Sequence, residues 1–217
     1  RMLFLKYRGE FSDHIKLKNA RYMTNGTKGH DRWEESLKRA RLLVSAEQNL
    51  DTTSLGIPLR GRYDFLIRNP IDNRNDLIEL KTMGHEKWKA LTLPHESHIA
   101  QWSIYAERIG ITHGYVVIED RDSLTPKYFP IRRDGMDVYV YSTRGGLKEE
   151  RKDYISNLYN RIKFVMWCDE NGKFPKDQCP DCIQWGCKQD GCVQYSNTLD
   201  LVTFEDWKAG EIRDTSD

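Results

Sequence analysis

The chain lacks any apolar run of the roughly 18 to 20 residues that a membrane-spanning helix needs. Its short apolar stretch at residues 2–5 has neither the length nor the flanks of a secretory signal peptide. No cysteine occurs before Cys168, which excludes a disulfide scaffold spread over the whole chain. We therefore expect a protein that is neither secreted nor membrane-embedded, in the cytoplasm or another reducing compartment.

Net charge is also scarce, at +1 for 217 residues, but the charges are unevenly placed. Residues 1–41 carry eleven Lys or Arg against five Asp or Glu, so the remainder is net acidic. A basic region can attract phosphate groups, and Lys28 and Arg32 within it are candidates to contact nucleic acid. Arg62, outside this region, is a third candidate. An ordinary solvated surface is the commoner explanation for such a region taken alone.

Helical and strand-like patterns alternate along the chain, without repeats or a low-complexity linker, which predicts an α/β fold with a mixed central sheet flanked by helices. Turn residues at 69–73 join two strands into a hairpin. We expect a main domain over residues 1–167, a cysteine-rich metal-binding segment over 168–198 and an acidic tail over 199–217. The expected helices are 27–43, 97–109 and 147–167, and the expected strands are 59–67, 76–82, 114–119, 127–132 and 137–141.

The hairpin carries the residues that indicate chemistry. Asp64 lies on its first strand, and Glu79, Leu80 and Lys81 follow on its second. Residues two apart on a strand share a face, so Glu79 and Lys81 project together while Leu80 enters the core. If Asp64 lies alongside, two carboxylates and one ammonium converge. Paired carboxylates favour a hard cation between them, which predicts Mg²⁺ or Mn²⁺ for phosphodiester hydrolysis.

Two further motifs flank this trio on predicted helices. Gly26-x-x-x-His30 precedes it, and Gln101-x-x-x-Tyr105 follows it. In this order and spacing, the motifs resemble the RecB-like branch of the PD-(D/E)XK nucleases over about residues 24–118. The resemblance implies a restriction-endonuclease-like core.

The resemblance also implies roles for individual residues. His30, Asp64, Glu79 and the Leu80 carbonyl would hold the metal, and Lys81 would act beside the attacking water. Gln101 and Tyr105 would position the substrate or the lysine. The implied activity is hydrolysis of DNA with single-stranded character or free ends, often as an exonuclease, with replication or recombination proteins as partners.

Two alternatives stay open. Cap-snatching RNA endonucleases use a similar set of His, Asp, Glu and Lys residues, although the Gln101-Tyr105 motif and the terminal cysteines argue against this activity. A nucleic-acid-binding module that retains the nuclease fold without catalysis is the other alternative. A damaged active site would favour that module, and every expected catalytic residue is present.

All five cysteines lie in the last 50 residues, and the four at positions 179–192 are compactly spaced. Four thiolates at this spacing favour a structural Zn²⁺ site, or alternatively an iron–sulfur cluster such as 4Fe-4S. Many RecB-like nucleases carry an iron–sulfur cluster, but with one cysteine before the core, which this chain does not show. The expected ligands are Cys179, Cys182, Cys187 and Cys192, with Cys168 as an alternative.

Overall fold

The computed structural model describes residues 17–51, 57, 60–175 and 200–214. The chain divides into two compact units, one covering Ile15–Asn157 and the other made of Arg1–His14 and Leu158–Asp217. The helices are α2 (Leu17–Arg39), α3 (His85–Ala90), α4 (Glu96–Arg108), α5 (Tyr154–Glu170) and α8 (Phe204–Asp214). The strands are β1 (Leu43–Ala46), β2 (Asn49–Asp51), β3 (Arg60–Arg62), β4 (Phe65–Arg68), β5 (Asn75–Met83), β6 (His113–Asp120), β7 (Pro126–Asp134), β8 (Asp137–Tyr141), β9 (Leu147–Arg151), β10 (Lys173–Pro175) and β11 (Asp200–Val202).

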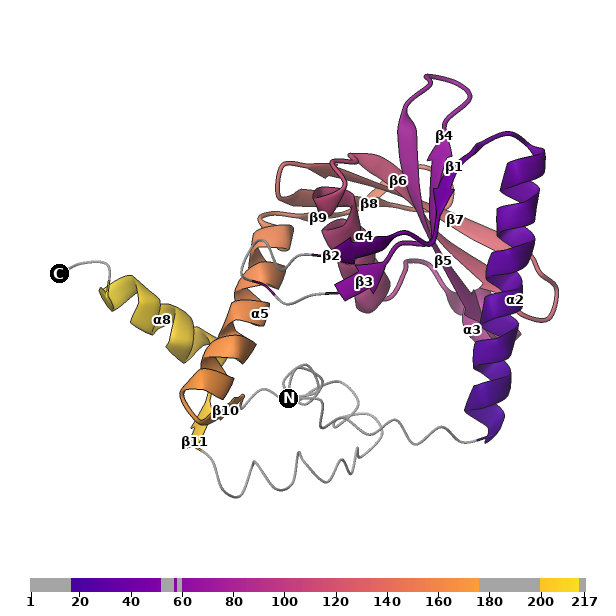
Figure 1. The fold of residues 1–217 in the computed structure, drawn as a ribbon. Helices are drawn as coiled ribbons and strands as arrows, with labels where there is room; N and C mark the ends of the chain where they lie inside the picture. Colours follow the sequence, from indigo (N-terminus) through magenta and orange to yellow (C-terminus); the bar gives the residue numbers. More distant parts are fainter. Residues whose placement is uncertain (1–16, 52–56, 58–59, 176–199, 215–217) are drawn as a thin grey trace. The chain divides into compact units, whose positions relative to one another are not determined.

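The larger unit is built on a seven-stranded sheet in the order β1-β4-β5-β6-β7-β8-β9 (Figure 1). Its two central strands, β5 and β6, run parallel, and each other neighbouring pair in this sheet is antiparallel. Parallel neighbours need a crossover connection, which here contains α3 and α4. The expected α/β class with a mixed central sheet and flanking helices is confirmed.

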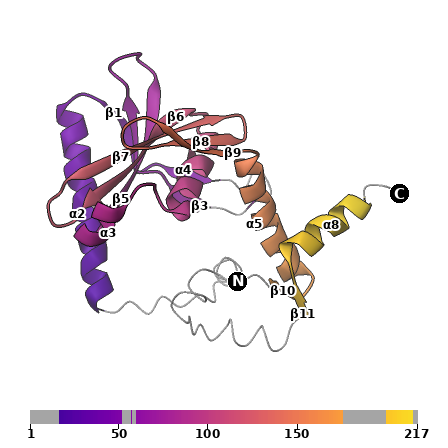
Figure 2. The ribbon, with the colours of Figure 1, turned by 180° about the vertical axis from the view of Figure 1, so that it is seen from behind.

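Side chains of β5 project from both faces of the sheet, and the two faces pack against different helices. Ile78 and Leu80 belong to an apolar cluster with Phe65 and with Leu37 of α2. Side chains alternate along a strand, so Leu77, Glu79 and Lys81 project from the opposite face. The indole of Trp102 in α4 donates a hydrogen bond to the Leu77 carbonyl at 3.0 Å. The sheet therefore lies between α2 and α4 (Figure 2).

A buried carboxylate attaches α2 to the sheet. Glu119 of β6 is 2% exposed and forms an ion pair with the Arg32 guanidinium. It also accepts a hydrogen bond from Trp33 Nε1 at 2.8 Å. A buried charge is stable only when it is paired and hydrogen-bonded, which these two α2 residues provide. Because Arg32 and Trp33 lie two and three residues after His30 on α2, the same contacts hold the position of His30.

The hairpin expected around residues 69–73 is confirmed, because β4 and β5 pair antiparallel across this turn. The single strand expected over 59–67 is wrong in one respect, since the structure divides it into β3 and β4 around Asp64. Its partner segment, residues 43–51, is divided in the same way into β1 and β2. Asp64 therefore lies where the hydrogen-bonded pairing between residues 43–51 and 60–68 is interrupted.

Two helix boundaries also differ from the sequence expectations. The helix expected over 27–43 begins earlier and ends at Arg39, because Arg41 adopts a left-handed φ of 57° and Leu43 starts β1. The helix expected over 147–167 was wrong at its start, where Leu147–Arg151 forms β9 against β8. Strand pairing there outweighs the helical preference of Lys, Glu and Arg, which is only a weak local prior.

The second unit is smaller and contains most of α5, followed by β10, β11 and α8. β10 and β11 pair in parallel, and Phe164 of α5 contacts Phe204 and Trp207 of α8 with ring centroids 5.6 and 5.8 Å apart. Residues 200–214, in the segment expected to be an acidic tail, thus form a strand and a helix. Among the helices that the structure describes, none has the length and apolar character required to cross a bilayer.

Candidate active site

The break between β3 and β4 fixes the direction of the Asp64 side chain. Asp64 is 7% exposed, and its Oδ2 accepts a hydrogen bond from the backbone N–H of Leu80 at 2.7 Å. Its own carbonyl accepts a bond from the backbone N–H of Glu47 at 2.9 Å. The Asp64 carboxylate is therefore held against β5 beside Glu79 and Lys81, while Oδ1 faces the other side.

Glu79 and Lys81 form an ion pair on the α4 face of β5. Only Oε1 of Glu79 takes part, because Oε2 is buried without a hydrogen-bond partner. Among the described residues only three buried side-chain atoms are in this condition, the others being Asn75 Oδ1 and His98 Nδ1. An unpartnered buried polar atom costs about 1 to 3 kcal/mol, so the fold tolerates a destabilising group here.

The two carboxyl groups disturb each other's ionisation. Burial, and after it the charge of Asp64, raise the pKa of Glu79 to about 8, because Lys81 only partly offsets them. Burial also raises the pKa of Asp64. Burial lowers the pKa of Lys81, but the carboxylates of Glu79 and Asp64 outweigh it and the net shift is upward. The single positive charge of Lys81 is thus too little to keep both Asp64 and Glu79 ionised at their ordinary pKa values.

His30 approaches this pair from α2, as the sequence motif predicts. Its Nδ1 lies 3.6 Å from Asp64 Oδ1 and 3.5 Å from Glu47 Oε1. Glu47 was not among the sequence candidates, because no motif marks it and its position depends on a left-handed φ of 50° at the irregular pairing. Arg62 lies 2.9 Å from the other oxygen of Glu47. Glu47 is therefore a second carboxylate beside the imidazole, in addition to Asp64.

Gln101 and Tyr105 lie on α4, one turn apart, and Gln101 Nε2 is 3.3 Å from the Tyr105 hydroxyl. The Tyr105 hydroxyl accepts a bond from the backbone N–H of Arg62, and its pKa is raised by burial and by the charge of Glu79. A Cβ at Gly61 would lie 2.6 Å from the Tyr105 hydroxyl. Glycine is thus required at position 61 for the tyrosine ring to lie against β3.

His98 belongs to the same face of α4 but had no assigned role from the sequence. Burial lowers its pKa to about 4, and the charges of Lys81 and then His95 contribute. The imidazole is therefore neutral at physiological pH. Its ring meets that of His95 edge to face, with centroids 5.4 Å apart.

The three basic residues predicted to contact nucleic acid have different surroundings. Lys28 is exposed on α2. The Arg32 side chain is 40% exposed but is paired with buried Glu119, so it contributes to the attachment of α2 as well. The Arg62 side chain is 57% exposed and pairs with Glu47, while its backbone N–H bonds to the Tyr105 hydroxyl.

In the described part of the chain, no three His, Cys, Asp or Glu side chains are grouped closely enough to form a ready-made metal site. The donor chemistry nevertheless fits a hard divalent cation. Glu79 Oε2 is buried and unpartnered, Asp64 Oδ1 faces the His30 imidazole, and both carboxyls have raised pKa values. A cation is the species that would relieve each of these costs.

The cysteine site predicted from the sequence lies outside the described residues, which include none of Cys179, Cys182, Cys187 and Cys192. Its Zn²⁺ or iron–sulfur occupancy stays a prediction. Cys168, the alternative ligand, is fully buried in α5, and burial raises the pKa of its thiol to about 12. A thiol held in its protonated form is a poor metal ligand, because metals bind the thiolate.

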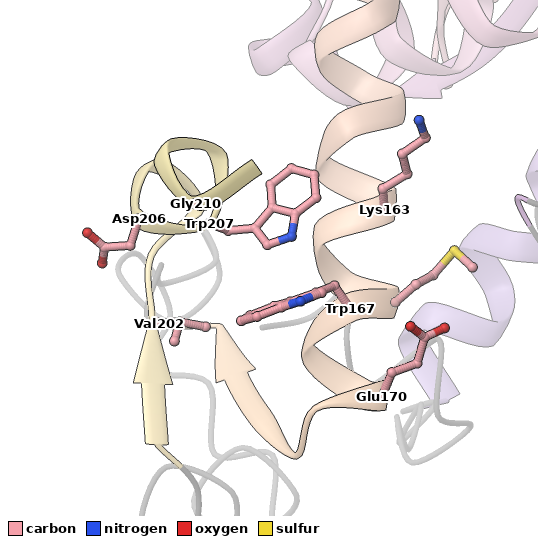
Figure 3. A pocket seen from close by; sticks show the side chains of 8 residues that line it. Lys163, Trp167, Glu170, Val202, Asp206, Trp207 and Gly210 are labelled. Carbon is pink, nitrogen blue, oxygen red and sulfur yellow. The ribbon is translucent and has the colours of Figure 1, made fainter. Parts of the chain in front are cut away.

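The second unit contains a cavity of about 620 Å³ between α5 and the β11–α8 segment (Figure 3). The rings of Trp167 and Trp207 project into it from α5 and α8. Two carboxylates and one ammonium also line it, from Glu170, Asp206 and Lys163. This charge balance does not favour a phosphate ligand, and none of the predicted catalytic residues lies here.

Comparisons with known proteins leave the family open. No family model matches the chain, and no curated protein matches it. A solved structure, the crystal structure of SSO0001, aligns with 75% of this chain and 82% of its own, at 16% sequence identity and a TM-score of 0.38. A likeness at this level carries no conclusion about function, so the site must be interpreted from its own geometry.

Proposed function

We propose that this protein is a metal-dependent deoxyribonuclease with a PD-(D/E)XK active site on a restriction-endonuclease-like core. The observation that carries the proposal is the buried, unpartnered Oε2 of Glu79 beside Asp64 and Lys81. A stable fold rarely keeps such an atom without a function for it. Two carboxylates with raised pKa values beside an ammonium are characteristic of a site that binds a cation and a phosphodiester.

Asp64, Glu79 and His30 would hold Mg²⁺ or Mn²⁺, with the Leu80 carbonyl as a further oxygen donor and Glu47 as a carboxylate beside His30. When bound, the cation would supply charge for the scissile phosphate and lower the pKa of a water. The chain's own contribution is to place Glu79 and the Leu80 carbonyl on β5, His30 on α2 and Asp64 at the break between β3 and β4. The hydrogen bond from Leu80 N–H to Asp64 fixes the Asp64 carboxylate against β5.

Lys81 would orient the attacking water and stabilise the negative charge that develops on the phosphate. Its raised pKa keeps the ammonium charged at neutral pH, which favours charge stabilisation over proton abstraction. The Gln101–Tyr105 pair would position the scissile phosphate next to Lys81. Lys28 and Arg62, both exposed, would contact neighbouring phosphates of the strand.

The proposed substrate is DNA that is single-stranded or has free ends, cleaved as an exonuclease, in a compartment that contains nucleic acid. Replication or recombination proteins are the corresponding class of partner. An RNA endonuclease of the cap-snatching type and a non-catalytic nucleic-acid-binding module are the alternatives. All three functions involve binding of nucleic acid, but they differ in which polymer is cleaved and whether any is. Cleavage measurements therefore distinguish them.

The test is incubation of the purified protein with end-labelled single-stranded DNA, double-stranded DNA and RNA of matched sequence, with and without Mn²⁺ or Mg²⁺. We expect DNA to be shortened only when the metal is present. Preferential cleavage of RNA would establish the first alternative instead. Binding of either polymer without cleavage under any metal condition would refute the catalytic proposal and support the binding module.

Gly61→Ala is expected to reduce cleavage roughly ten- to hundredfold, since the new methyl group would displace the Tyr105 ring and a misplacement of this size is costly in an active site. Gly61 has no left-handed φ, so the backbone itself should accept alanine. Steady-state cleavage rates would be compared with those of Tyr105→Phe and of the double variant.

If both changes act through the tyrosine ring, their effects should not add in the double variant. Thermal unfolding should show that each variant remains folded. Fully additive losses would instead show that the alanine damages the site by another route.

A further inference from the structure

The row of polar residues on α4 extends beyond Gln101 and Tyr105 to His98. His98 lies three residues before Gln101 and seven before Tyr105, which places all three on one face of the helix. The charge of Lys81 acts on both His98 and Tyr105. One lysine is therefore close to both ends of this row.

His98 has a buried ring nitrogen, Nδ1, that no described group satisfies. Glu79 Oε2, on the face of β5 toward α4, is also unpartnered, so these two atoms do not hydrogen-bond to each other. Two of the three unpartnered buried atoms among the described residues thus belong to groups that interact with Lys81. Since buried polar atoms are nearly always paired, we take these two atoms to mark two different bound groups, the cation at Glu79 Oε2 and a hydrogen-bonding group at His98 Nδ1.

The charge state of His98 limits what the group bound there can be. Burial and the neighbouring ammonium keep the imidazole neutral, so one ring nitrogen carries a proton and the other does not. The non-bridging oxygens of a phosphodiester only accept hydrogen bonds. A neutral donor beside Lys81 supplies such a bond without the repulsion that a second cation would bring.

We propose that His98 is a third substrate-contacting residue of α4, and that its neutral imidazole donates a hydrogen bond through Nδ1 to a phosphate oxygen of the bound DNA strand. The inference rests on the proposed nuclease function and extends it. His98 marks the N-terminal end of a contact row whose other end is Tyr105 against Gly61. The strand would run along α4 between these two ends.

The test compares His98→Phe, His98→Asn and His98→Gln. The amide nitrogen of Asn is bonded to Cγ, as Nδ1 is in histidine, whereas that of Gln lies one bond farther out, near the position of Nε2. We expect His98→Phe and His98→Gln to lower kcat/KM for single-stranded DNA with Mn²⁺ roughly ten- to hundredfold, the range for one hydrogen bond to a charged group. His98→Asn should stay within about threefold of wild type, because it restores that bond.

Thermal unfolding separates this role from a structural one. Removing an unpartnered buried nitrogen should leave the melting temperature of His98→Phe unchanged or raised, while loss of a structural histidine would lower it. His113→Phe, a histidine of β6 outside the site, is the matched control and should cleave like wild type.

The outcomes also separate this inference from the proposed function. Wild-type cleavage together with full activity of His98→Phe would overturn the role of His98 and leave the nuclease standing. Equal losses in the Asn and Phe variants would overturn the assignment of the bond to Nδ1. Absence of cleavage by the wild-type protein under every metal condition would overturn both.

Discussion

Glu79→Gln and Lys81→Met are each expected to slow metal-dependent DNA cleavage by about a thousandfold or more. Glu79→Gln keeps the shape of the side chain but removes the charge that would hold the cation. Lys81→Met keeps most of the aliphatic length and removes the ammonium that would lie beside the scissile phosphate. Single-turnover cleavage of end-labelled DNA would measure the chemical step apart from binding and product release.

Neither substitution should unfold the protein. Glu79 is a buried acid with an unpartnered oxygen, so its replacement removes a cost as well as an ion pair. Glu86→Gln and Lys148→Met, both at exposed positions, are matched controls that should retain wild-type activity. Variants at both site positions that stay folded and cleave at the wild-type rate would refute the proposed mechanism.

Gly114→Ala is expected to destabilise the fold by about 3 kcal/mol or more, near or above the upper range for overpacked cores. A Cβ at this position would lie 1.9 Å from the carbonyl oxygen of Leu77 and 2.8 Å from its carbonyl carbon. These are backbone atoms of the neighbouring parallel strand, directly opposite in the register. Relief would require β5 and β6 to separate at the centre of the sheet.

Urea unfolding followed by circular dichroism would give the loss in free energy of unfolding. Domains are stable by only about 5 to 15 kcal/mol, so a loss of this size could unfold much of the protein. Poor solubility of Gly114→Ala would then also indicate the expected destabilisation. Gly146→Ala is the control, since the nearest atom to its added methyl would be Ser142 Oγ at an ordinary 3.7 Å. Equal stability of the two variants would contradict the close approach of the central strands.

Local sequence patterns were sufficient for the central strands of this fold. The turn at 69–73 and the alternation from Leu77 to Lys81 correctly indicated a hairpin with Glu79 and Lys81 on one face. The same reasoning was wrong for Leu147–Arg151, whose charged residues suit a helix. Its partner β8 decides the outcome there, and sequence periodicity does not reveal which segment a strand will pair with.

The candidate site shows the same limit. Asp64, Glu79, Lys81 and Gln101 occur in recognisable motifs, so their grouping could be anticipated. Glu47 could not, because it reaches His30 only through irregular pairing between residues 43–51 and 60–68. The unsatisfied nitrogen of His98 is likewise a property of its surroundings and not of any sequence pattern.

The buried carboxyl of Glu79 would link the proposed cation binding to proton release. With its pKa raised to about 8 from an ordinary 4.5, the folded, metal-free protein holds a proton here at neutral pH that the unfolded chain has given up. The contribution of Glu79 to stability therefore declines as the pH rises from about 4.5 to about 8. A cation that binds would displace this proton, so its apparent affinity would increase as the pH rises toward about 8 and would level off above it. At every lower pH, protons would compete with the cation for the carboxylate.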